Sequence, residues 1–94
     1  MLMNKIISKK LKELNSKGNG KEYRYLKNVD CILSIDSTGA NVLPLNDDNT
    51  INWNLVRPLE SMNKDWENQL LKGDLFFIYN VVPLLQLKLQ WKCL

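Results

Sequence analysis

The stretch CILSIDSTGANVLPL, residues 31–45, decides the fold. Apolar and small side chains alternate along residues 31–35, turn-forming residues follow at 36–39, and a second extended run returns over 40–45. Two such runs joined by a short turn that ends in glycine are typical of an antiparallel β-hairpin. Pro44 has no backbone N–H to donate, which favours a sheet edge or a bulge at that position. The stretch therefore predicts an antiparallel sheet.

Four further segments are predicted to extend this sheet. Short apolar or aromatic runs lie at 22–28, 51–53 and 74–80. The clearest signal is at 85–93, where Leu, Leu, Leu, Trp and Cys take alternate positions and Gln or Lys take the positions between them. Strict alternation of this kind is the pattern of a strand with one buried face. Together with the hairpin, these segments give a sheet of five or six strands.

Two segments have the period of an amphipathic helix. Apolar residues form one stripe along residues 2–14, and the Asn, Ser and Gly residues at 15–20 favour a helix end there. In residues 58–70, a proline suited to a first helical turn precedes a second stripe that includes Trp66. The predicted fold is α+β in a single domain, residues 1–94. It has an N-terminal helix, an antiparallel sheet of five or six strands, and one helix inserted between strands.

The charge is distributed unevenly along the chain. The net charge is +3, but residues 1–27 carry eight Lys or Arg and two Glu, while residues 28–94 carry five Lys or Arg and eight Asp or Glu. The basic first third could therefore face an acidic partner or the acidic remainder of the chain. The two cysteines, Cys31 and Cys93, have no metal-ligand spacing and are interpreted as thiols of a reducing compartment, with a disulfide as the alternative.

The apolar runs predict neither a membrane segment nor a signal peptide. The longest run, residues 75–85, is too short to span a bilayer and contains an asparagine and a proline. The N-terminal residues have no cleavage site of small side chains. The expected location is the cytoplasm, and in a virus it would be the cytosol of the infected host.

The residue types argue against catalysis. The 94 residues include no histidine, which removes the commonest general base and the commonest metal ligand. No catalytic residue, metal site or cofactor is predicted, and Asp47 and Asp48 are interpreted as a solvated turn. The expected activity is binding without enzymatic turnover.

Two groups of residues could bind a partner. Tyr23, Arg24, Tyr25 and Trp53 combine aromatic faces with positive charge, as nucleotide-binding sites do. The alternative for the two tyrosines is packing within the sheet, because residues two apart on a strand share a face. The alternative for Trp53 is a position in the core. A second group consists of lysines on the polar face of the first helix, which either contact a phosphate or acidic partner or are simply solvated. These are Lys5, Lys9 and Lys12.

Part of the chain resembles a known family. The segment Leu11–Lys21, which leads from a helix into a Gly-Lys step, Trp53, and the run Asp65-Trp66-Glu67 are similar to features of small phage Thoeris anti-defence proteins. The resemblance covers roughly residues 6–67, and the 27 residues after Glu67 have no counterpart. It implies a protein that sequesters a signal similar to cyclic ADP-ribose.

Two functional hypotheses follow. The first is a small, non-enzymatic phage-type binding or inhibitor protein that acts in counter-defence, by sequestering a nucleotide signal or by blocking a host defence protein. The alternative is a nucleic-acid-binding accessory protein that uses the basic N-terminal helix. The predicted terminal strand would leave an exposed sheet edge, which favours a homodimer or a higher homo-oligomer.

Overall fold

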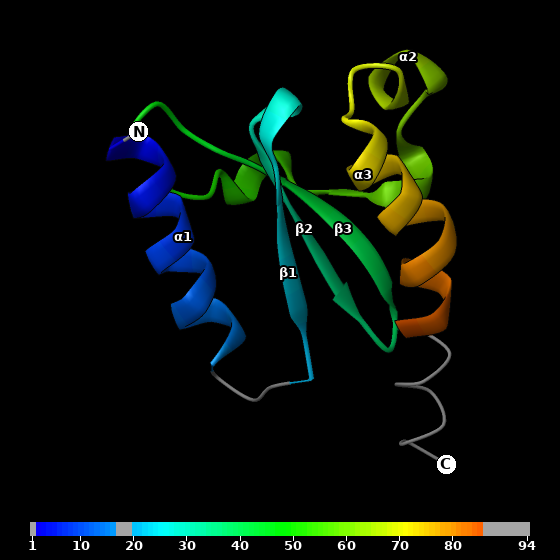
Figure 1. Ribbon diagram of the computed structural model, residues 1–94, viewed down its shortest axis with the longest axis horizontal. Coiled ribbons are helices and arrows are strands. Elements are labelled where there is room, and N and C mark those ends of the chain that lie inside the picture. The colour runs from blue at the N-terminus through cyan, green and yellow to red at the C-terminus, as the bar shows by residue number, and fades with distance from the viewer. Residues whose placement is uncertain (1, 17–19, 86–94) are drawn as a thin grey trace.

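The protein has an α+β fold built on a four-stranded antiparallel sheet. The computed structural model describes residues 2–16 and 20–85, with side chains from residue 7 onward. The strands follow one another in chain order across the sheet. They are β1 (Glu22–Leu26), β2 (Cys31–Asp36), β3 (Gly39–Pro44) and β4 (Arg57–Pro58). Figure 1 shows helices on both sides of this sheet.

The predicted hairpin at residues 31–45 is confirmed. β2 and β3 pair over their full lengths, from Cys31 opposite Pro44 to Asp36 opposite Gly39. The Asp36 carboxylate closes the turn, because it accepts hydrogen bonds from the backbone N–H of Thr38 at 2.8 Å and from its hydroxyl at 2.5 Å. Gly39 has a φ of 141°, a value that glycine adopts without steric cost.

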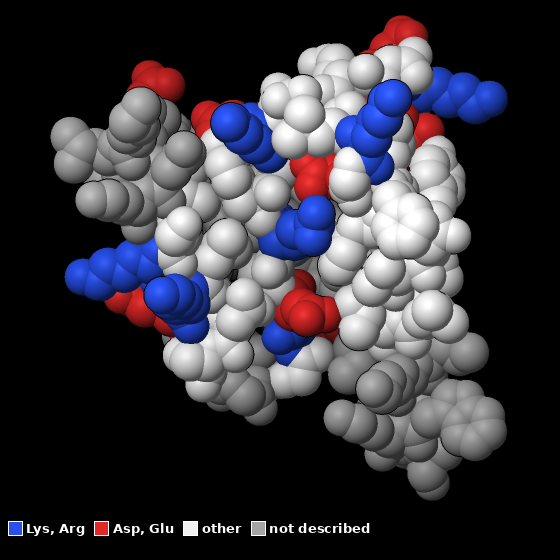
Figure 2. Space-filling model, in the orientation of Figure 1, with Lys and Arg blue, Asp and Glu red and all other residues white. Residues whose placement is uncertain are grey.

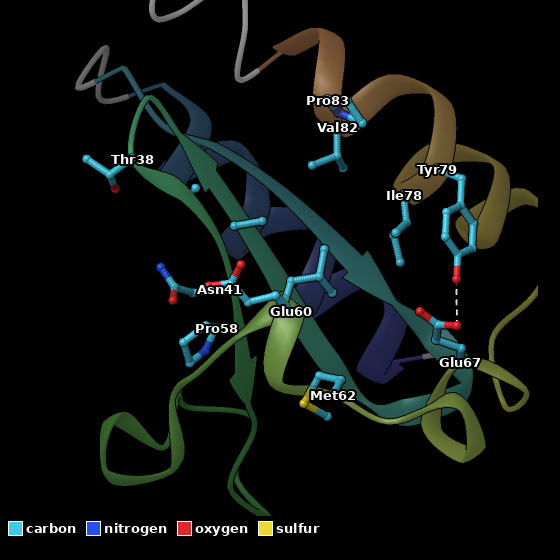
Figure 3. A pocket seen from close by; sticks show the side chains of 13 residues that line it. Thr38, Asn41, Pro58, Glu60, Met62, Glu67, Ile78, Tyr79, Val82 and Pro83 are labelled. Atoms are coloured by element: carbon cyan, nitrogen blue, oxygen red, sulfur yellow. Dashed lines mark hydrogen bonds between the residues drawn. The ribbon is translucent and has the colours of Figure 1, made fainter.

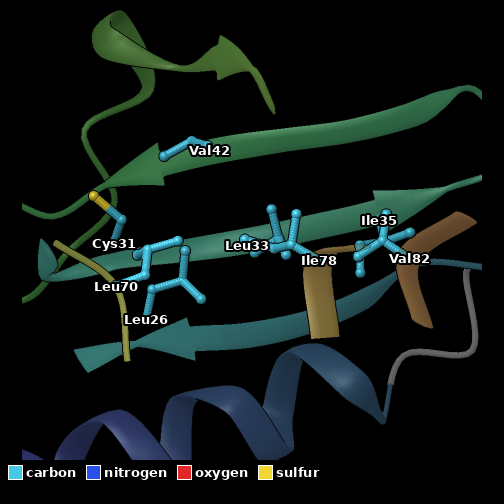
Figure 4. Packing of buried hydrophobic residues seen from close by; sticks show 8 residues of the cluster. All are labelled: Leu26, Cys31, Leu33, Ile35, Val42, Leu70, Ile78 and Val82. Atoms are coloured by element: carbon cyan, nitrogen blue, oxygen red, sulfur yellow. The ribbon is translucent and has the colours of Figure 1, made fainter. Parts of the chain in front are cut away.

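Strand alternation gives the sheet two apolar faces. One face carries alternate residues of the three long strands and packs against the C-terminal helices, as Figure 4 shows. Its buried strand residues are Leu26, Cys31, Leu33, Ile35 and Val42, and its buried partners from the helices are Leu70, Ile78 and Val82. The other face packs against α1 (Leu2–Asn15), the predicted N-terminal helix. Ile32, Leu43 and Ile51 are buried on that face.

Asn15, the last residue of α1, holds this helix to the sheet. Its amide oxygen accepts the backbone N–H of Tyr23 at 2.9 Å, and its amide nitrogen donates to the Tyr23 carbonyl at 3.3 Å. Leu11 and Leu14 pack against the buried residues of the same sheet face. The side chain of Asn15 therefore satisfies both backbone groups of a strand residue next to the helix.

The sequence prediction of five or six strands is wrong, because the described residues form four. Residues 74–80 are helical instead of extended: α3 (Lys72–Phe76) leads into the π-helical turn η4 (Phe77–Val81), and helix continues to residue 85. A short apolar run has no period that separates a strand from a buried helix. The i, i+3, i+7 spacing of Leu75, Ile78 and Val82 places all three against the sheet.

In the described residues, no α-helix is inserted between strands. The predicted helix over 58–70 is replaced by β4, a 3₁₀ turn η3 (Leu59–Ser61) and the short α2 (Lys64–Glu67), all after β3. Asn63 is extended, and its side chain accepts the backbone N–H of Trp66 at 2.9 Å, so a new helix begins there. The predicted stripe is still directed inward, because Leu59, Met62, Trp66 and Leu70 all pack in one core.

Two other predicted strands have different outcomes. In residues 51–53 only Ile51 pairs, in an isolated bridge with Leu45, and Trp53 begins the 3₁₀ turn η2 (Trp53–Leu55). The predicted strand at 85–93 lies outside the described residues except for Leu85, which is helical. Among the described residues, none of the helices has the length and apolar character needed to cross a bilayer.

Candidate functional site

Strand β1 separates the predicted aromatic and basic residues. Tyr23 and Tyr25 face α1 and are half-buried beside Ile32 and Leu43. Arg24 points to the opposite face of the sheet, where it contacts α3 and η4. The structure therefore does not bring Tyr23, Arg24, Tyr25 and Trp53 together in one site.

The two tyrosines have structural contacts. Tyr25 stands opposite Ile32 across the strands, and Tyr23 stands opposite Ser34, which is the cross-strand packing that the sequence allowed as an alternative. The Tyr25 hydroxyl donates to the Asp30 carboxylate at 2.7 Å. Burial, followed by this hydrogen bond and the charge of Asp30, raises the pKa of Tyr25 to about 12.

Arg24 is part of a charged contact inside the fold. Its Nε lies 3.0 Å from Oδ1 of Asp74 in α3, and its guanidinium carbon lies 4.4 Å from the centre of the Phe77 ring. The second carboxylate oxygen of Asp74 is buried and has no hydrogen-bond partner among the described residues. Since these contacts use both the charge and the face of the guanidinium, Arg24 connects the sheet to the C-terminal helices.

Of the three aromatic residues predicted to bind a ligand, Trp53 is the exposed one. Its side chain is 68% exposed. It lines a cleft of about 300 Å³ between α1 and the loop that follows β3. Lys10 and Glu13 reach this cleft from α1, and Leu14 and Ile51 supply apolar surface. An aromatic, a basic and an acidic residue thus line one small cavity, and Lys10 is a contributor that the sequence prediction did not include.

The lysine face of α1 is exposed where the structure describes its side chains. Lys9 and Lys12 are exposed, and the side chain of Lys5 lies outside the described part of the chain. Figure 2 shows blue side chains over α1 at the left, in contrast to the largely uncharged surface over η4 at the right. The helix therefore offers exposed positive charge at Lys9 and Lys12, apart from Lys10, which lines the Trp53 cleft.

A larger groove lies on the opposite side of the sheet. It has a volume of about 640 Å³ and runs between the β3–β4 edge and the C-terminal helix. Figure 3 shows Ile78 and Val82 pointing from the helix toward the strands, with Pro58 and Met62 on the other wall. The sequence prediction missed this groove, because one wall comes from a segment that it interpreted as a strand.

The polar wall of the groove is acidic. The Tyr79 hydroxyl donates to Oε2 of Glu67 at 2.5 Å, drawn as a dashed line in Figure 3. This hydrogen bond, followed by burial and the charge of Glu67, raises the pKa of Tyr79. Glu60 also lines the groove, and none of the described residues that line it is a lysine or arginine. An acidic groove of this kind favours a cationic or hydrogen-bond-donating ligand over an anionic one.

The described part of the chain gives no support for metal binding or for a reactive thiol. No cluster of three or more His, Cys, Asp or Glu could hold a metal ion there. Cys31 is a free thiol inside the core, where burial raises its pKa and so disfavours the reactive thiolate. Cys93 lies outside the described residues. No family model, curated protein or solved structure matches the chain.

Proposed function

We propose that the protein is a small, non-enzymatic binding protein that holds a nucleotide-like ligand against Trp53. The observation that carries this proposal is the exposed indole at the edge of a 300 Å³ cleft that also contains Lys10 and Glu13. Large exposed aromatic side chains beside a cavity commonly serve recognition, since burying them on binding releases apolar surface from water.

The cleft offers a complementary group for each part of a nucleotide. The Trp53 indole can stack on a base, the Lys10 ammonium can contact a phosphate, and the Glu13 carboxylate can accept hydrogen bonds from ribose hydroxyls. Its volume is at the lower end of the range for small-molecule sites, which suits one base with its ribose. Sequestration of a nucleotide signal of the cyclic ADP-ribose type, in counter-defence inside a host cell, is the role that the sequence resemblance adds.

The test is a titration of Trp53 fluorescence in a variant whose other tryptophans are replaced by phenylalanine. A cyclic ADP-ribose-type nucleotide should quench the fluorescence of the indole, and the quenching should reach a plateau as the site is saturated. A stacked aromatic contact contributes about 1–3 kcal/mol, so Trp53→Ala should weaken binding roughly 5- to 150-fold when measured by calorimetry. Lys10→Gln should weaken binding of the nucleotide more than binding of the corresponding nucleoside, because only the nucleotide has a phosphate to contact.

Leu55→Ala is the matched control. Leu55 is an exposed apolar residue of the same 3₁₀ turn, and it does not line the cleft. The proposal fails if Leu55→Ala and Trp53→Ala weaken nucleotide binding equally, or if no nucleotide alters the fluorescence of Trp53.

Nucleic-acid binding is the second candidate function, and the exposure of Lys9 and Lys12 on α1 favours it. Backbone phosphates displace counterions, so affinity for single-stranded DNA would fall steeply as salt rises. The affinity for a single nucleotide stacked on Trp53 would fall much less as salt rises. A salt series with each ligand therefore separates the two functions.

A further inference from the structure

The groove on the other side of the sheet ends at an open strand edge. β3 has six residues, but β4 pairs only with Asn41 and Val42. Gly39 and Ala40 line the groove beyond that pairing. The register directs the backbone N–H and C=O of Ala40 outward, where no strand of the described residues pairs with them. An unpaired strand edge presents backbone donors and acceptors that an added extended chain can satisfy.

The side chains around this edge define what could lie on it. The apolar floor is formed by residues such as Leu59, Met62, Ile78 and Val82. Among the described residues, the charged side chains in the lining are Glu60 and Glu67, both carboxylates. An occupant that alternates apolar residues with lysine or arginine would match both features, because successive side chains of a strand point to opposite sides.

Exposed apolar side chains also lie beyond the groove. Phe76 and Leu84 are each 64% exposed, and Tyr79 is 58% exposed, all on the helix that forms one wall. Figure 2 shows a largely uncharged surface over this helix. Exposed apolar residues next to a groove with acidic side chains are typical of a protein-binding surface, with aromatic residues as the usual anchors.

We propose that this groove binds an extended, basic and apolar segment of a partner protein, which adds as a strand to β3 and places its cationic side chains against Glu60 and Glu67. The Trp53 cleft is on the α1 side of the sheet, so the two sites are separate. The second site would let one small chain hold a protein in addition to a small ligand.

The probe is the acetylated and amidated peptide Ser-Val-Lys-Val-Lys-Val-Ser-Gly, titrated into the full-length chain by calorimetry and by amide NMR. Binding should shift the amide signals of Gly39 and Ala40. A charge-assisted contact contributes enough that Glu60→Gln with Glu67→Gln should weaken binding about tenfold. Asp65→Asn is the matched control, because Asp65 is an exposed carboxylate beside the groove in α2 and is not part of its lining.

Two altered peptides test the mode of binding. Replacing both lysines by glutamate should abolish binding, and replacing the central valine by proline should weaken it about tenfold or more, since proline cannot donate a strand hydrogen bond. Three results would each overturn the proposal. The glutamate peptide could bind as tightly as the lysine peptide, or the Glu60 and Glu67 double variant could have the same effect as Asp65→Asn. The third is that the lysine peptide does not bind at millimolar concentration. These results are independent of nucleotide binding at Trp53.

Two further measurements show whether the groove is instead occupied by the chain's own C-terminal residues or by a second copy of the chain. Lys88→Gln with Lys92→Gln removes the lysines from the chain's own C-terminal residues, which lie outside the described part. If that variant binds the peptide about tenfold more tightly, the chain's own C-terminal residues compete for the groove and the partner proposal is overturned. It is likewise overturned if the Glu60 and Glu67 variant turns a dimer into a monomer in sedimentation, because a second copy would then be the occupant.

Discussion

Arg24 and Asp74, fifty residues apart in the chain, meet at 3.0 Å and join the first strand to the C-terminal helix. The Arg24 side chain is 39% exposed and the Asp74 side chain only 7%. The arginine thus partly shields a carboxylate that has almost no access to water. A buried carboxylate needs such a partner, because a charge without one is costly in a protein interior.

Replacing Arg24 should therefore destabilise the fold. We expect Arg24→Ala to lower the free energy of unfolding by about 1–3 kcal/mol, since it leaves the Asp74 carboxylate buried without its donor. Urea unfolding measures the change, with Lys27→Ala as the control because Lys27 is an exposed cation next to the same strand. If the two variants unfold at the same urea concentration, the ion pair contributes nothing to stability. A double variant, Arg24→Met with Asp74→Leu, should regain most of the loss.

Local patterns in the sequence predicted the parts of the fold that local chemistry determines. The hairpin follows from alternation and from the turn at Asp36 and Gly39, and α1 follows from a single apolar stripe. The second apolar stripe, which includes Trp66, correctly predicted that its side chains pack in the core. It incorrectly predicted that they lie on one continuous helix. Ser61 and Asn63 bond to the nearby backbone, which breaks the segment into a 3₁₀ turn and a capped α2.

The candidate sites depend on contacts that the sequence does not encode locally. Tyr23 and Arg24 are neighbours in the chain, but β1 directs them to opposite faces. The pairing of Arg24 with Asp74, and of Tyr79 with Glu67, joins residues far apart in the chain. The cleft beside the exposed Trp53 depends on where α1 packs.

Trp53 and Trp66 should respond differently to truncation. Trp66 is partly buried against the main core, so we expect Trp66→Ala to cost about 2–4 kcal/mol of unfolding free energy. Trp53→Ala should cost less than about 1 kcal/mol, because the side chain is mostly in water. Acrylamide quenching of variants whose single tryptophan is Trp53 or Trp66 gives an independent measure of the exposure of each side chain. Equal quenching of both would contradict the difference in burial.

The exposed lysines of α1 should matter to a partner more than to stability. Lys9→Gln with Lys12→Gln should change the free energy of unfolding by no more than about 0.5 kcal/mol, since both side chains are solvated. If the chain binds nucleic acid through this face, the variant should also reduce the salt slope of single-stranded DNA binding by about 1.4, or 0.7 for each lost phosphate contact. Lys64→Gln, on α2, is the control for loss of charge elsewhere. An unchanged slope would remove this face from the nucleic-acid hypothesis.

Tyr25 should make the protein less stable at high pH. Burial and the hydrogen bond to Asp30 raise its pKa from 10.0 to about 12, so between these values the unfolded chain has lost the phenolic proton while the folded chain retains it. The unfolded state then binds fewer protons, and the free energy of unfolding falls as pH rises through this window. The contribution is complete below about pH 10 and is lost by about pH 12.

Tyr25→Phe isolates this effect because phenylalanine does not titrate. Urea unfolding between pH 9 and pH 12 should show a shallower decline in the variant than in the wild type, with the two curves diverging only above about pH 10. Asp30→Asn should lower the pKa of Tyr25 in an ultraviolet titration of tyrosinate, since it removes the charge that disfavours ionisation. If wild type and Tyr25→Phe lose stability in parallel across this window, Tyr25 ionises equally well in the folded and unfolded chains. The contact with Asp30 would then have no part in the alkaline transition.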